Sequence, residues 1–473
     1  MRNTWLKKIV LLSMSTLLFA GCSSGPANKT EQPSSLKVMY MDERYFFQQY
    51  GDLFAMKHPN IDIQVVSTRS MYGNGEIKDY DKAFNEFVEK EKPDIILLDP
   101  ERYGKYAADG KLAELDTLIQ RDKYNTETIY PALLELLKEK GGGKLYGLSP
   151  SFYGDAVFYN ADLFKKYGID LPKDGITWQE LLDSARRFPT DGEEKTRIYG
   201  YGNRYSLGAS ELVQSIASTE GLKYINQDTQ KVTINTDSWK KAVKLAMDAL
   251  DSKAIYNPKD GGFQGGTMEE YYQSDLFLMG RMAITRGNAS ILQNIKEAKN
   301  ALKNYKPFEI GIVAGPVDPA APDKTRNVSI GEIFSIRANT ENADAAWEFI
   351  KFINGDEFAK VKSRTFSSGL LSRMGYTKEL DGISLEAFYK LSPDIGNNIL
   401  STEDKIPNDF YMKFQPLLEK EIGLIVDKKK SIDEALKTIQ DEGQAALDQS
   451  IKDKAVGKDT KPGSSDQSSG STK

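Results

Sequence analysis

The sequence predicts an α/β protein with two or three domains. Strand-like and helix-like patterns alternate over residues 36–99, which is typical of a sheet covered by helices. The chain has 473 residues, whereas one domain usually takes roughly 100–200. Residues 144–164, KLYGLSPSFYGDAVFYNADLF, contain strand-like segments interrupted by Ser149-Pro150. A strand that stops at a proline and then resumes lets the chain leave one sheet and enter another. We therefore place the first interdomain crossing here.

The composition is that of an ordinary soluble globular protein with an acidic surface. Hydrophobic residues make up 40% of the chain and charged residues 28%, with 63 Lys and Arg against 68 Asp and Glu. Residues 1–21 hold three of the basic residues and no acidic one, so the chain without them is more acidic still. Nucleic-acid binding depends on clustered positive charge. We therefore expect no nucleic-acid partner.

The N-terminus has the pattern of a targeting segment. Basic residues precede an apolar run over residues 9–20, which is shorter than the roughly 20 residues that a membrane-spanning helix needs. The run ends in FAGC at 19–22, which resembles the bacterial lipoprotein box, although leucine is usual where Phe19 stands. In that motif residues 1–21 are removed as a signal peptide and Cys22 is acylated, which anchors the protein on the extracellular face of the cell membrane. An ordinary secretory peptide is the alternative, and it would leave the single cysteine as a free thiol.

Both ends of the chain lack the pattern of a packed fold. Residues 22–35 are polar, contain two prolines and show no apolar periodicity, so we expect a lipid-anchored tether. Residues 452–473 have no core-forming side chain after Val456, and we expect a disordered tail there. The folded body is therefore expected within residues 36–451.

The body begins with alternating strand and helix patterns. Residues 36–40 predict a strand, and an amphipathic helix separates it from a second strand over residues 61–66. Residues 93–99, PDIILLD, are apolar at consecutive positions, as in a parallel strand buried on both faces. Ligands of open α/β sheets bind outside the carboxyl ends of the strands. This rule directs attention to the loops at residues 40–45 and 99–103.

The tryptophans are predicted to be core residues rather than ligand platforms. Residues 177–180, TWQE, form a capping box, and Trp178 opens an apolar helix face behind it. Trp239 and Trp347 also stand in helix-like runs, and the fourth tryptophan lies in the N-terminal segment. No tryptophan therefore remains as an obvious site residue.

Seven short motifs follow one another along nearly all of the folded body. They are FAMKHPNIDI at 54–63, PDII at 93–96, YGLSP at 146–150, VFYNADLF at 157–164, TWQEL at 177–181, FLMGRMAI at 277–284 and AAWEFI at 345–350. Each motif alone is weakly specific. In this order they resemble the family 1 extracellular solute-binding proteins, the lipid-anchored or periplasmic receptors of ABC importers, which include maltose-binding protein.

The resemblance implies a two-lobed periplasmic-binding-protein-like fold of type II. In this fold two α/β lobes, each formed from discontinuous segments, are joined by a hinge and close on a ligand. Carried onto this chain, lobe 1 takes residues 36–150 with 330–366, and lobe 2 takes residues 151–329 with 367–451.

These boundaries imply two further crossings between the lobes. The second is expected within residues 328–336 and the third within residues 364–371. Gly331 and Gly369 lie in these stretches and suit the backbone changes of a hinge.

The same resemblance implies a function as a lipid-anchored extracellular receptor. The protein would capture a small polar solute between its lobes and deliver it to an ABC permease in the membrane. A sugar or oligosaccharide is the solute that we favour, and a non-sugar solute such as a peptide or a polyamine is the alternative. We expect a monomer with no cofactor and no metal.

An enzyme is the competing class of protein. His58 is the only histidine and no cysteine follows Cys22, so the sequence lacks the usual zinc sites and histidine-assisted nucleophiles. The run GGGK at 141–144 lacks the glycine spacing and the Ser or Thr of a phosphate loop. A secreted glycoside hydrolase stays open, because 68 acidic residues always offer carboxylate pairs. We predict a binding protein and not an enzyme.

Seven residues lie in the loops that, by the resemblance, would face the cleft between the lobes. Aromatic rings stack on sugar C–H surfaces, while carboxylates, amides and guanidinium groups bond to hydroxyls, and small-molecule clefts usually combine the two. The expected ligand-binding residues are Tyr45, Asp99, Tyr153, Tyr205, Asn288, Glu332 and Arg364.

Four of these residues also have a structural alternative. Asp99 precedes a proline and could serve only to shape a turn. Tyr153 could pack within the hinge, and Glu332 and Arg364 could form ion pairs.

A departure from the family concerns Ala289, where many sugar-binding relatives carry an aromatic residue. Stacking would then fall to tyrosine and phenylalanine, of which the chain has 24 and 21.

Overall fold

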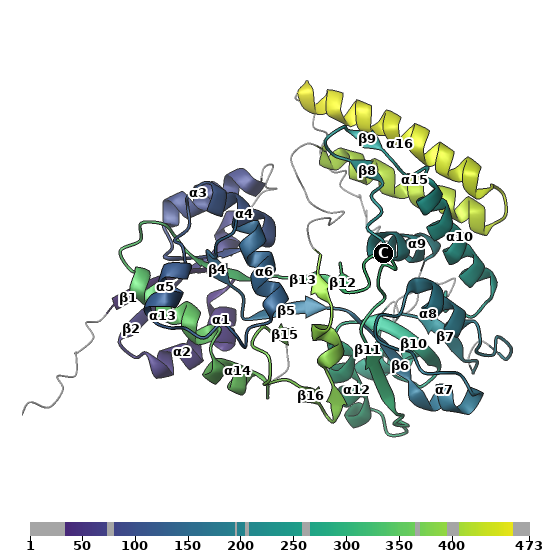
Figure 1. Ribbon diagram of the computed structural model, residues 1–473, viewed down its shortest axis with the longest axis horizontal. Coiled ribbons are helices and arrows are strands. Elements are labelled where there is room, and N and C mark those ends of the chain that lie inside the picture. Colours follow the sequence, from purple (N-terminus) through teal and green to yellow (C-terminus); the bar gives the residue numbers. More distant parts are fainter. Residues whose placement is uncertain are drawn as a thin grey trace, which may run out of the picture.

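The structure is a two-lobed α/β fold, as the sequence predicts. The computed structural model describes residues 34–72, 80–193, 196–203, 208–257, 265–364, 369–394 and 406–456. Figure 1 shows most helices and strands gathered in two lobes, with a small sheet of three strands between them. The predicted signal peptide, the predicted lipidation site Cys22, the predicted ligand contact Tyr205 and the chain from residue 457 lie outside the described residues.

A five-stranded sheet forms the centre of the first lobe. In spatial order its strands are β2 (Ile61–Ser67), β1 (Ser34–Tyr40), β3 (Ile95–Leu98), β14 (Ile333–Ile336) and β4 (Gly147–Leu148). β1 pairs in parallel with β2 and β3, whereas β14 is antiparallel to β3 and β4. The sheet therefore combines the N-terminal strands with a segment from much further along the chain.

Aromatic packing holds helices of this lobe together. Phe46 and Phe54 are fully buried, and their ring centres lie 5.6 and 5.1 Å from that of Phe349. Rings of this size supply much of the apolar area that a core buries. The helices of this lobe are α1 (Glu43–Phe46), the π-helix η1 (Phe47–Gly51), α2 (Asp52–Lys57), the 3₁₀-helix η2 (Thr68–Tyr72), α3 (Tyr80–Glu91), α4 (Pro100–Ala108), α5 (Asp116–Arg121), α6 (Pro131–Lys140), α13 (Ala343–Ile353) and α14 (Asp356–Lys362).

A four-stranded sheet forms the centre of the second lobe. In spatial order its strands are β11 (Ile310–Val313), β6 (Ala156–Asn160), β10 (Met282–Gly287) and β7 (Tyr199–Gly202). β6 is antiparallel to β10 and β11, and β7 is parallel to β10. The helices of this lobe are α7 (Ala161–Tyr167), α8 (Trp178–Ala185), α9 (Ala209–Thr219), α10 (Asp237–Asp251), α11 (Met268–Ser274), α12 (Ser290–Ala301), α15 (Asn408–Val426) and α16 (Ile432–Ala455).

The two long C-terminal helices, α15 and α16, lie side by side at the edge of the second lobe (Figure 1). Gly443 of α16 faces Phe414 of α15, where an added Cβ would come within 2.8 Å of the ring. Phe414 also stacks on Tyr224, with ring centres 4.8 Å apart. The missing side chain of Gly443 thus permits the close approach of the two helices.

Three short strands form the connecting sheet between the lobes. They are β13 (Val328–Ser329), β5 (Ser151–Gly154) and β15 (Leu370–Leu371), and both outer strands are antiparallel to the central β5. Each strand lies in or next to a stretch for which the sequence predicts a crossing. The remaining short elements are β8 (Ile225–Asn226), β9 (Lys231–Val232), β12 (Lys324–Thr325), β16 (Glu379–Leu380), β17 (Ile383–Ser384), β18 (Ser392–Pro393) and the 3₁₀-helix η3 (Glu386–Tyr389).

Regular structure extends beyond the predicted body at both ends. β1 starts at Ser34, whose N–H donates to the carbonyl of Asn60 at 3.0 Å, so the predicted tether 22–35 is too long by two residues. Backbone pairing with β2 needs no apolar side chain. At the other end α16 continues to Ala455, which shortens the predicted tail 452–473. Lys452 and Lys454 stand in its last turn, where positive charge is favourable.

Residues 369–394 are not confined to the second lobe, although the sequence predicts lobe 2 from residue 367. In the first lobe the N–H of Tyr130 donates to the carbonyl of Ser372 at 2.7 Å. The N–H of Met374 donates to the carbonyl of Thr128 at the same distance. This segment forms strands of only two residues, which leave no periodic pattern in the sequence.

The three described tryptophans are core residues, as predicted. Trp178, Trp239 and Trp347 are each at most 2% exposed. Their ring N–H groups are bonded: that of Trp178 donates to Thr219 Oγ1 at 2.9 Å and that of Trp347 to Asp122 Oδ2 at 2.9 Å.

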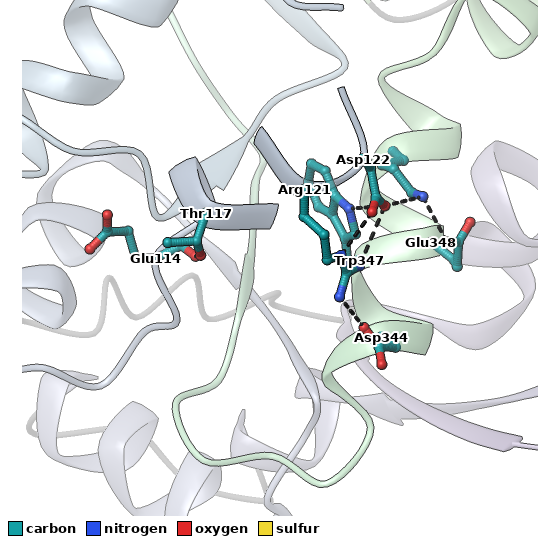
Figure 2. Close-up of polar contacts among 8 residues, drawn as sticks. Glu114, Thr117, Arg121, Asp122, Asp344, Trp347 and Glu348 are labelled. Carbon is teal, nitrogen blue, oxygen red and sulfur yellow. Dashed lines mark hydrogen bonds and ion pairs between the residues drawn. The ribbon is translucent and has the colours of Figure 1, made fainter. Parts of the chain in front are cut away.

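Asp122 forms the centre of a polar network that ties α5 to α13. Figure 2 shows its carboxylate between Arg121 and Trp347, and the network continues from Arg121 to Asp344. Arg121 Nε donates to the carboxylate at 2.8 Å and Lys351 Nζ donates at 2.7 Å. These hydrogen bonds, that of Arg121 above all, hold the pKa of Asp122 well below its usual range.

Candidate ligand-binding site

A glutamate held by two tyrosines lies at the carboxyl end of β1. Tyr40 is the last residue of β1, Tyr50 lies in the π-helix η1, and Glu332 directly precedes β14. The Tyr40 hydroxyl donates to Glu332 Oε1 at 2.6 Å, and the Tyr50 hydroxyl donates to Oε2 at 2.5 Å. Each carboxylate oxygen therefore has one fixed donor. The carboxylate is held in a defined orientation where ligands of α/β sheets commonly bind.

Burial keeps both tyrosines protonated. It raises the pKa of Tyr40 and of Tyr50 well above the ordinary value, and the negative charge of Glu332 raises both further. The two hydroxyls therefore act as donors to the carboxylate at neutral pH. Tyr40 is 1% exposed and Tyr50 is 7% exposed, so both donors to Glu332 are buried side chains.

Two half-exposed tyrosines lie beside this group. Tyr45 is 40% exposed, and its ring stacks on that of Tyr40 with centres 6.3 Å apart. Tyr153, on β5, is 39% exposed. Burial raises the pKa of Tyr153, and the charges of Glu332 and Tyr45 add to this. The structure thus brings three predicted site residues together: Tyr45, Tyr153 and Glu332.

The ring of Tyr153 lies next to two glycines that the sequence predicts as hinge residues. A Cβ added at Gly331 would lie 3.7 Å from this ring, and one added at Gly369 would lie 3.3 Å from it. Gly369 has a φ of +112°, and its added Cβ would also approach the Phe152 carbonyl oxygen to 2.9 Å. Both the conformation and the space therefore require glycine at residue 369.

Polar residues of the second lobe gather at one edge of its sheet. β6 begins where β10 ends, since Ala156 pairs with Gly287 in antiparallel register. Asp155, just before β6, therefore meets Arg286 at the end of β10, with Oδ2 and Nη2 3.3 Å apart. The Arg286 guanidinium also lies 5.8 Å from the ring centre of Trp178. The arginine is held by a charge on one side and an aromatic ring on the other.

Two asparagines extend this edge. Asn288 follows β10, and its Oδ1 accepts from the N–H of Ser290 at 3.0 Å, at the start of α12. Asn203 follows β7, and its buried Oδ1 has no hydrogen-bond partner within the described ranges. A buried acceptor without a donor is uncommon and unfavourable. A ligand hydroxyl is one group that could supply the donor.

The central strand β5 connects the two groups. Tyr153, beside Glu332, and Asp155, beside Arg286, are two residues apart on this stretch of chain. An extended chain rises about 3.3 Å per residue, so their Cα atoms lie within roughly 7 Å of each other. The tyrosine rings and the fixed carboxylate of Glu332 thus lie next to the ion pair of Asp155 and Arg286. This combination suits a small polar ligand with apolar faces.

The other predicted residues are placed differently. Asp99 caps α4: its Oδ1 accepts from the N–H groups of Glu101 and Arg102 at 3.0 and 2.8 Å. Its Oδ2 accepts from Arg102 Nη1 at 2.7 Å, so the turn-shaping alternative describes this side chain in the structure. Arg364 is exposed in the turn after α14, and Tyr205 lies outside the described residues.

The sequence did not single out Tyr40, Tyr50, Asp155, Asn203 or Arg286. Tyr40 lies in the loop range that the strand-end rule selects, so that rule contained its signal. Tyr50 stands in a helical pattern that reads as core. The three residues of the second lobe come together only through the strand order of its sheet, which the sequence does not reveal.

A surface pocket of about 590 Å³ lies in the second lobe, between the loop 170–176 and α8, and contains none of the site residues above. No group of three His, Cys, Asp or Glu side chains in the described parts of the chain could hold a metal ion. None of the described helices is both long and apolar enough to cross a membrane.

Comparison with known proteins gives the family. Residues 39–360 match the family model described as bacterial extracellular solute-binding protein. This match spans the connecting sheet's β5 and β13 and most of both lobes. The chain belongs to this family, whose members are solute-binding proteins rather than enzymes.

Individual relatives are distant in sequence. An arabinooligosaccharide-binding protein of Bacillus subtilis is 24% identical over 362 residues, which cover 75% of this chain and 77% of the relative. The sn-glycerol-3-phosphate-binding periplasmic protein of Escherichia coli is 23% identical over 62% of this chain and 64% of its own length. The solved sugar-binding protein MalE of Xanthomonas citri shares the fold with a TM-score of 0.60 and 14% identity, over 90% of this chain and all of that one.

Proposed function

We propose that the protein is a receptor of an ABC importer, which captures a sugar or oligosaccharide between its lobes and delivers it unchanged to a membrane permease. The observation that carries this proposal is the site itself. Two half-exposed tyrosine rings flank a carboxylate with two fixed donors, and an arginine–aspartate pair adjoins them. Tyrosine faces stack on sugar C–H surfaces, and the polar groups order the hydroxyls.

The ligand contacts that we propose come from both lobes. Tyr45, Tyr153 and Glu332 contribute from one side, and Arg286 with Asn288 from the other. The acceptor of Asn203 would bind a ligand hydroxyl. Tyr205, Asp99 and Arg364 remain predicted contacts; for Asp99 this would require the ligand to share the carboxylate with the N-terminus of α4.

The charge of the site disfavours an anionic ligand. Glu332 and Asp155 carry two carboxylates against one guanidinium, from Arg286. The relative that binds sn-glycerol 3-phosphate takes a phosphate ester. A phosphate would face repulsion from both carboxylates, so we favour the sugar class named for the arabinooligosaccharide-binding relative and for MalE. A peptide or a polyamine is the alternative solute.

The boundaries of the lobes are part of the proposal. Lobe 1 takes residues 36–150 with 330–366 and lobe 2 takes residues 151–329 with 367–451, except that residues 369–394 bond to both. The connecting sheet would then be the hinge. Its three strands support this role because they are short, and because Gly369 directly precedes β15 while Gly331 lies two residues after β13.

The competing proposal is a secreted glycoside hydrolase. Such an enzyme needs one carboxyl group that stays protonated to act as an acid. Both oxygens of Glu332 already accept a hydrogen bond from a tyrosine hydroxyl, and Asp155 is engaged by Arg286. Purified protein incubated with arabinooligosaccharides and maltooligosaccharides should therefore release no shorter sugar. Formation of product would replace the receptor with the hydrolase.

Two variants test the site, one at the residue beside Glu332 and one at the partner of Asp155. A thermal-shift screen of oligosaccharides first identifies a sugar that stabilises the folded protein. Tyr153→Ala and Arg286→Ala should each weaken binding of that sugar by about tenfold to a hundredfold, because each removes a contact worth roughly 1.5–3 kcal/mol. Isothermal titration calorimetry measures the change. Met56→Ala, at a site that is 79% exposed on α2, is the control and should bind as the parent does. Normal affinity in both site variants would contradict the proposed site.

The lipid anchor is a separate proposal, made from the lipoprotein-like motif that ends at Cys22. Several acyl chains hold a protein firmly on a membrane. Cys22→Ser should therefore move the protein from the membrane fraction to the soluble fraction without changing its affinity for the sugar. Fractionation followed by immunoblotting measures the partition. An unchanged membrane fraction in the variant would exclude anchoring through this cysteine.

A further inference from the structure

Residues 369–394 form a strap that is fixed to the first lobe at its start. The side chain of Arg373 is 3% exposed and donates to four partners of that lobe, the Asn125 carbonyl among them. Its Nε donates to the Asn354 carbonyl at 2.7 Å, and Nη1 donates to Thr128 Oγ1 at 2.6 Å. Nη2 donates to the Tyr124 hydroxyl at 2.8 Å. A buried cation with this many donors in use holds its segment in place.

The other end of the strap is fixed to the second lobe. Asp394 pairs with Arg326, with Oδ2 and Nη2 2.7 Å apart. The N–H of Ser392 donates to the carbonyl of Asp323 at 2.9 Å, and β12 pairs with β18. Lys390 Nζ lies 2.5 Å from Asp174 Oδ2, in the loop before α8. This end therefore moves with the second lobe.

One residue of the first lobe reaches across to this end. Tyr130 stands at the N-terminus of α6, and its hydroxyl donates to the carbonyl of Leu391. Its ring also packs edge-on against Tyr389, with ring centres 5.5 Å apart. Leu391 adjoins Lys390 and Ser392, which the second lobe holds. The hydrogen bond of Tyr130 is thus a contact between the lobes.

This contact lies on the side of the connecting sheet away from the candidate site. Neighbouring side chains of a strand point to opposite faces. Tyr153 of β5 is half-exposed beside Glu332, whereas Phe152 is fully buried. Phe152 packs on Tyr130 with ring centres 5.1 Å apart and on Tyr389 at 5.4 Å. The Tyr130 contact therefore belongs to the Phe152 face, and the ligand site to the Tyr153 face.

We infer that Tyr130 is a positioning residue that holds the lobes open from behind and so lowers the affinity for the solute. This inference rests on the proposed function as a receptor that closes, and it takes the described arrangement, in which Tyr45 and Tyr153 of the site are half-exposed, as the open form. A rotation that brings the lobes together on the Tyr153 face must spread them on the Phe152 face. The Tyr130 hydroxyl then leaves the carbonyl of Leu391. An interaction that is made only in the open form stabilises that form. Ligand binding has to supply this free energy before the lobes can close, so the apparent affinity is lower.

The size of the effect follows from the chemistry of this hydrogen bond. Burial raises the pKa of Tyr130 to about 12, so the hydroxyl keeps its proton at neutral pH and remains a donor. Tyr130→Phe removes this donor and retains the ring that packs on Phe152. The ratio of closed to open protein should therefore rise about twofold to tenfold, as expected for one net hydrogen bond.

The test uses the protein without any ligand. Met41 follows β1 and is 49% exposed, so Met41→Cys in a Cys22→Ser background takes a spin label beside the site in the first lobe. Paramagnetic relaxation of the Gly287 and Asn288 amides in the second lobe reports even a rare closed form by NMR. Tyr130→Phe should raise this relaxation about twofold to tenfold, in proportion to the closed fraction.

A matched variant separates this role from a general loss of stability. The Tyr106 hydroxyl donates to Asn85 within the first lobe. Tyr106→Phe should leave the relaxation at the parent value. Relaxation in Tyr130→Phe that equals or falls below the parent value, or an equal rise in Tyr106→Phe, would overturn the inference. Because no sugar is added, this outcome is independent of whether sugar is the solute.

Discussion

Single carboxylates in this protein are held by several donors at once. Glu332 accepts from two tyrosine hydroxyls, and Asp122 accepts from an indole, an ammonium and a guanidinium. Asp94 in the first lobe likewise accepts from the backbone of Lys37 and from Asn342. Hydrogen bonds to a charged group are stronger than neutral ones, and they fix its direction. The same chemistry thus serves the candidate site in one place and the packing of helices in another.

Asp122 allows one such carboxylate to be tested for its contribution to the stability of the fold. Asp122→Ala should lower the free energy of unfolding by about 1–3 kcal/mol, because the buried N–H of Trp347 loses its acceptor. Urea unfolding measures the change. Asp344→Ala is the control: this carboxylate also pairs with Arg121 but is 83% exposed, so the cost should stay below about 1 kcal/mol.

The pH dependence of the same variant has a definite sign. The pKa of Asp122 is lowered in the folded protein, so its stabilisation is present above the ordinary aspartate pKa of about 3.9 and is lost as the pH falls below it. The difference in unfolding free energy between parent and Asp122→Ala should therefore shrink in acid. A difference that is constant from neutral pH to pH 3 would contradict the assigned role.

At the scale of elements, the sequence predicted what depends on local pattern. The consecutive apolar residues of β3 indicated a buried strand, and the break at Ser149-Pro150 lies directly before the crossing strand β5. Tyr45, Tyr153 and Glu332 could be predicted because each lies in a loop or strand that the resemblance selects. Asp99 shows where prediction from the sequence ends. An aspartate before a proline suits both a ligand-binding loop and a helix cap, and only the hydrogen bonds in the structure show that Asp99 caps α4.

Other elements left no local signal. The pairing of Asp155 with Arg286 requires β6 and β10 to be antiparallel neighbours, which is a property of the whole sheet. The strap 369–394 is built from two-residue strands and side-chain bonds to distant segments, such as that of Arg373 to Thr128. Residue patterns of period 2 or 3.6 cannot reveal contacts of this kind.

At the scale of the whole molecule, closure should be visible as a change of shape. Saturation with the sugar found by the thermal-shift screen should reduce the radius of gyration in small-angle X-ray scattering, because the ligand binds the closed form more tightly than the open one. At a sugar concentration equal to the parent dissociation constant, Tyr153→Ala should remain mostly in the open form. If the parent protein binds the sugar and its radius does not change, capture by closure is the wrong mechanism.

The place of β14 in the first sheet also has a consequence for how the chain folds during its synthesis. All four residues of β3 pair with β14, so the apolar strand Ile95–Leu98 keeps an open edge until residues 333–336 have emerged. Contacts this distant in sequence form slowly, and open edges of apolar strands tend to aggregate. The N-terminal lobe cannot be completed while the chain is still short. We therefore expect a newly made chain to complete this lobe only after β14 has emerged, late in synthesis.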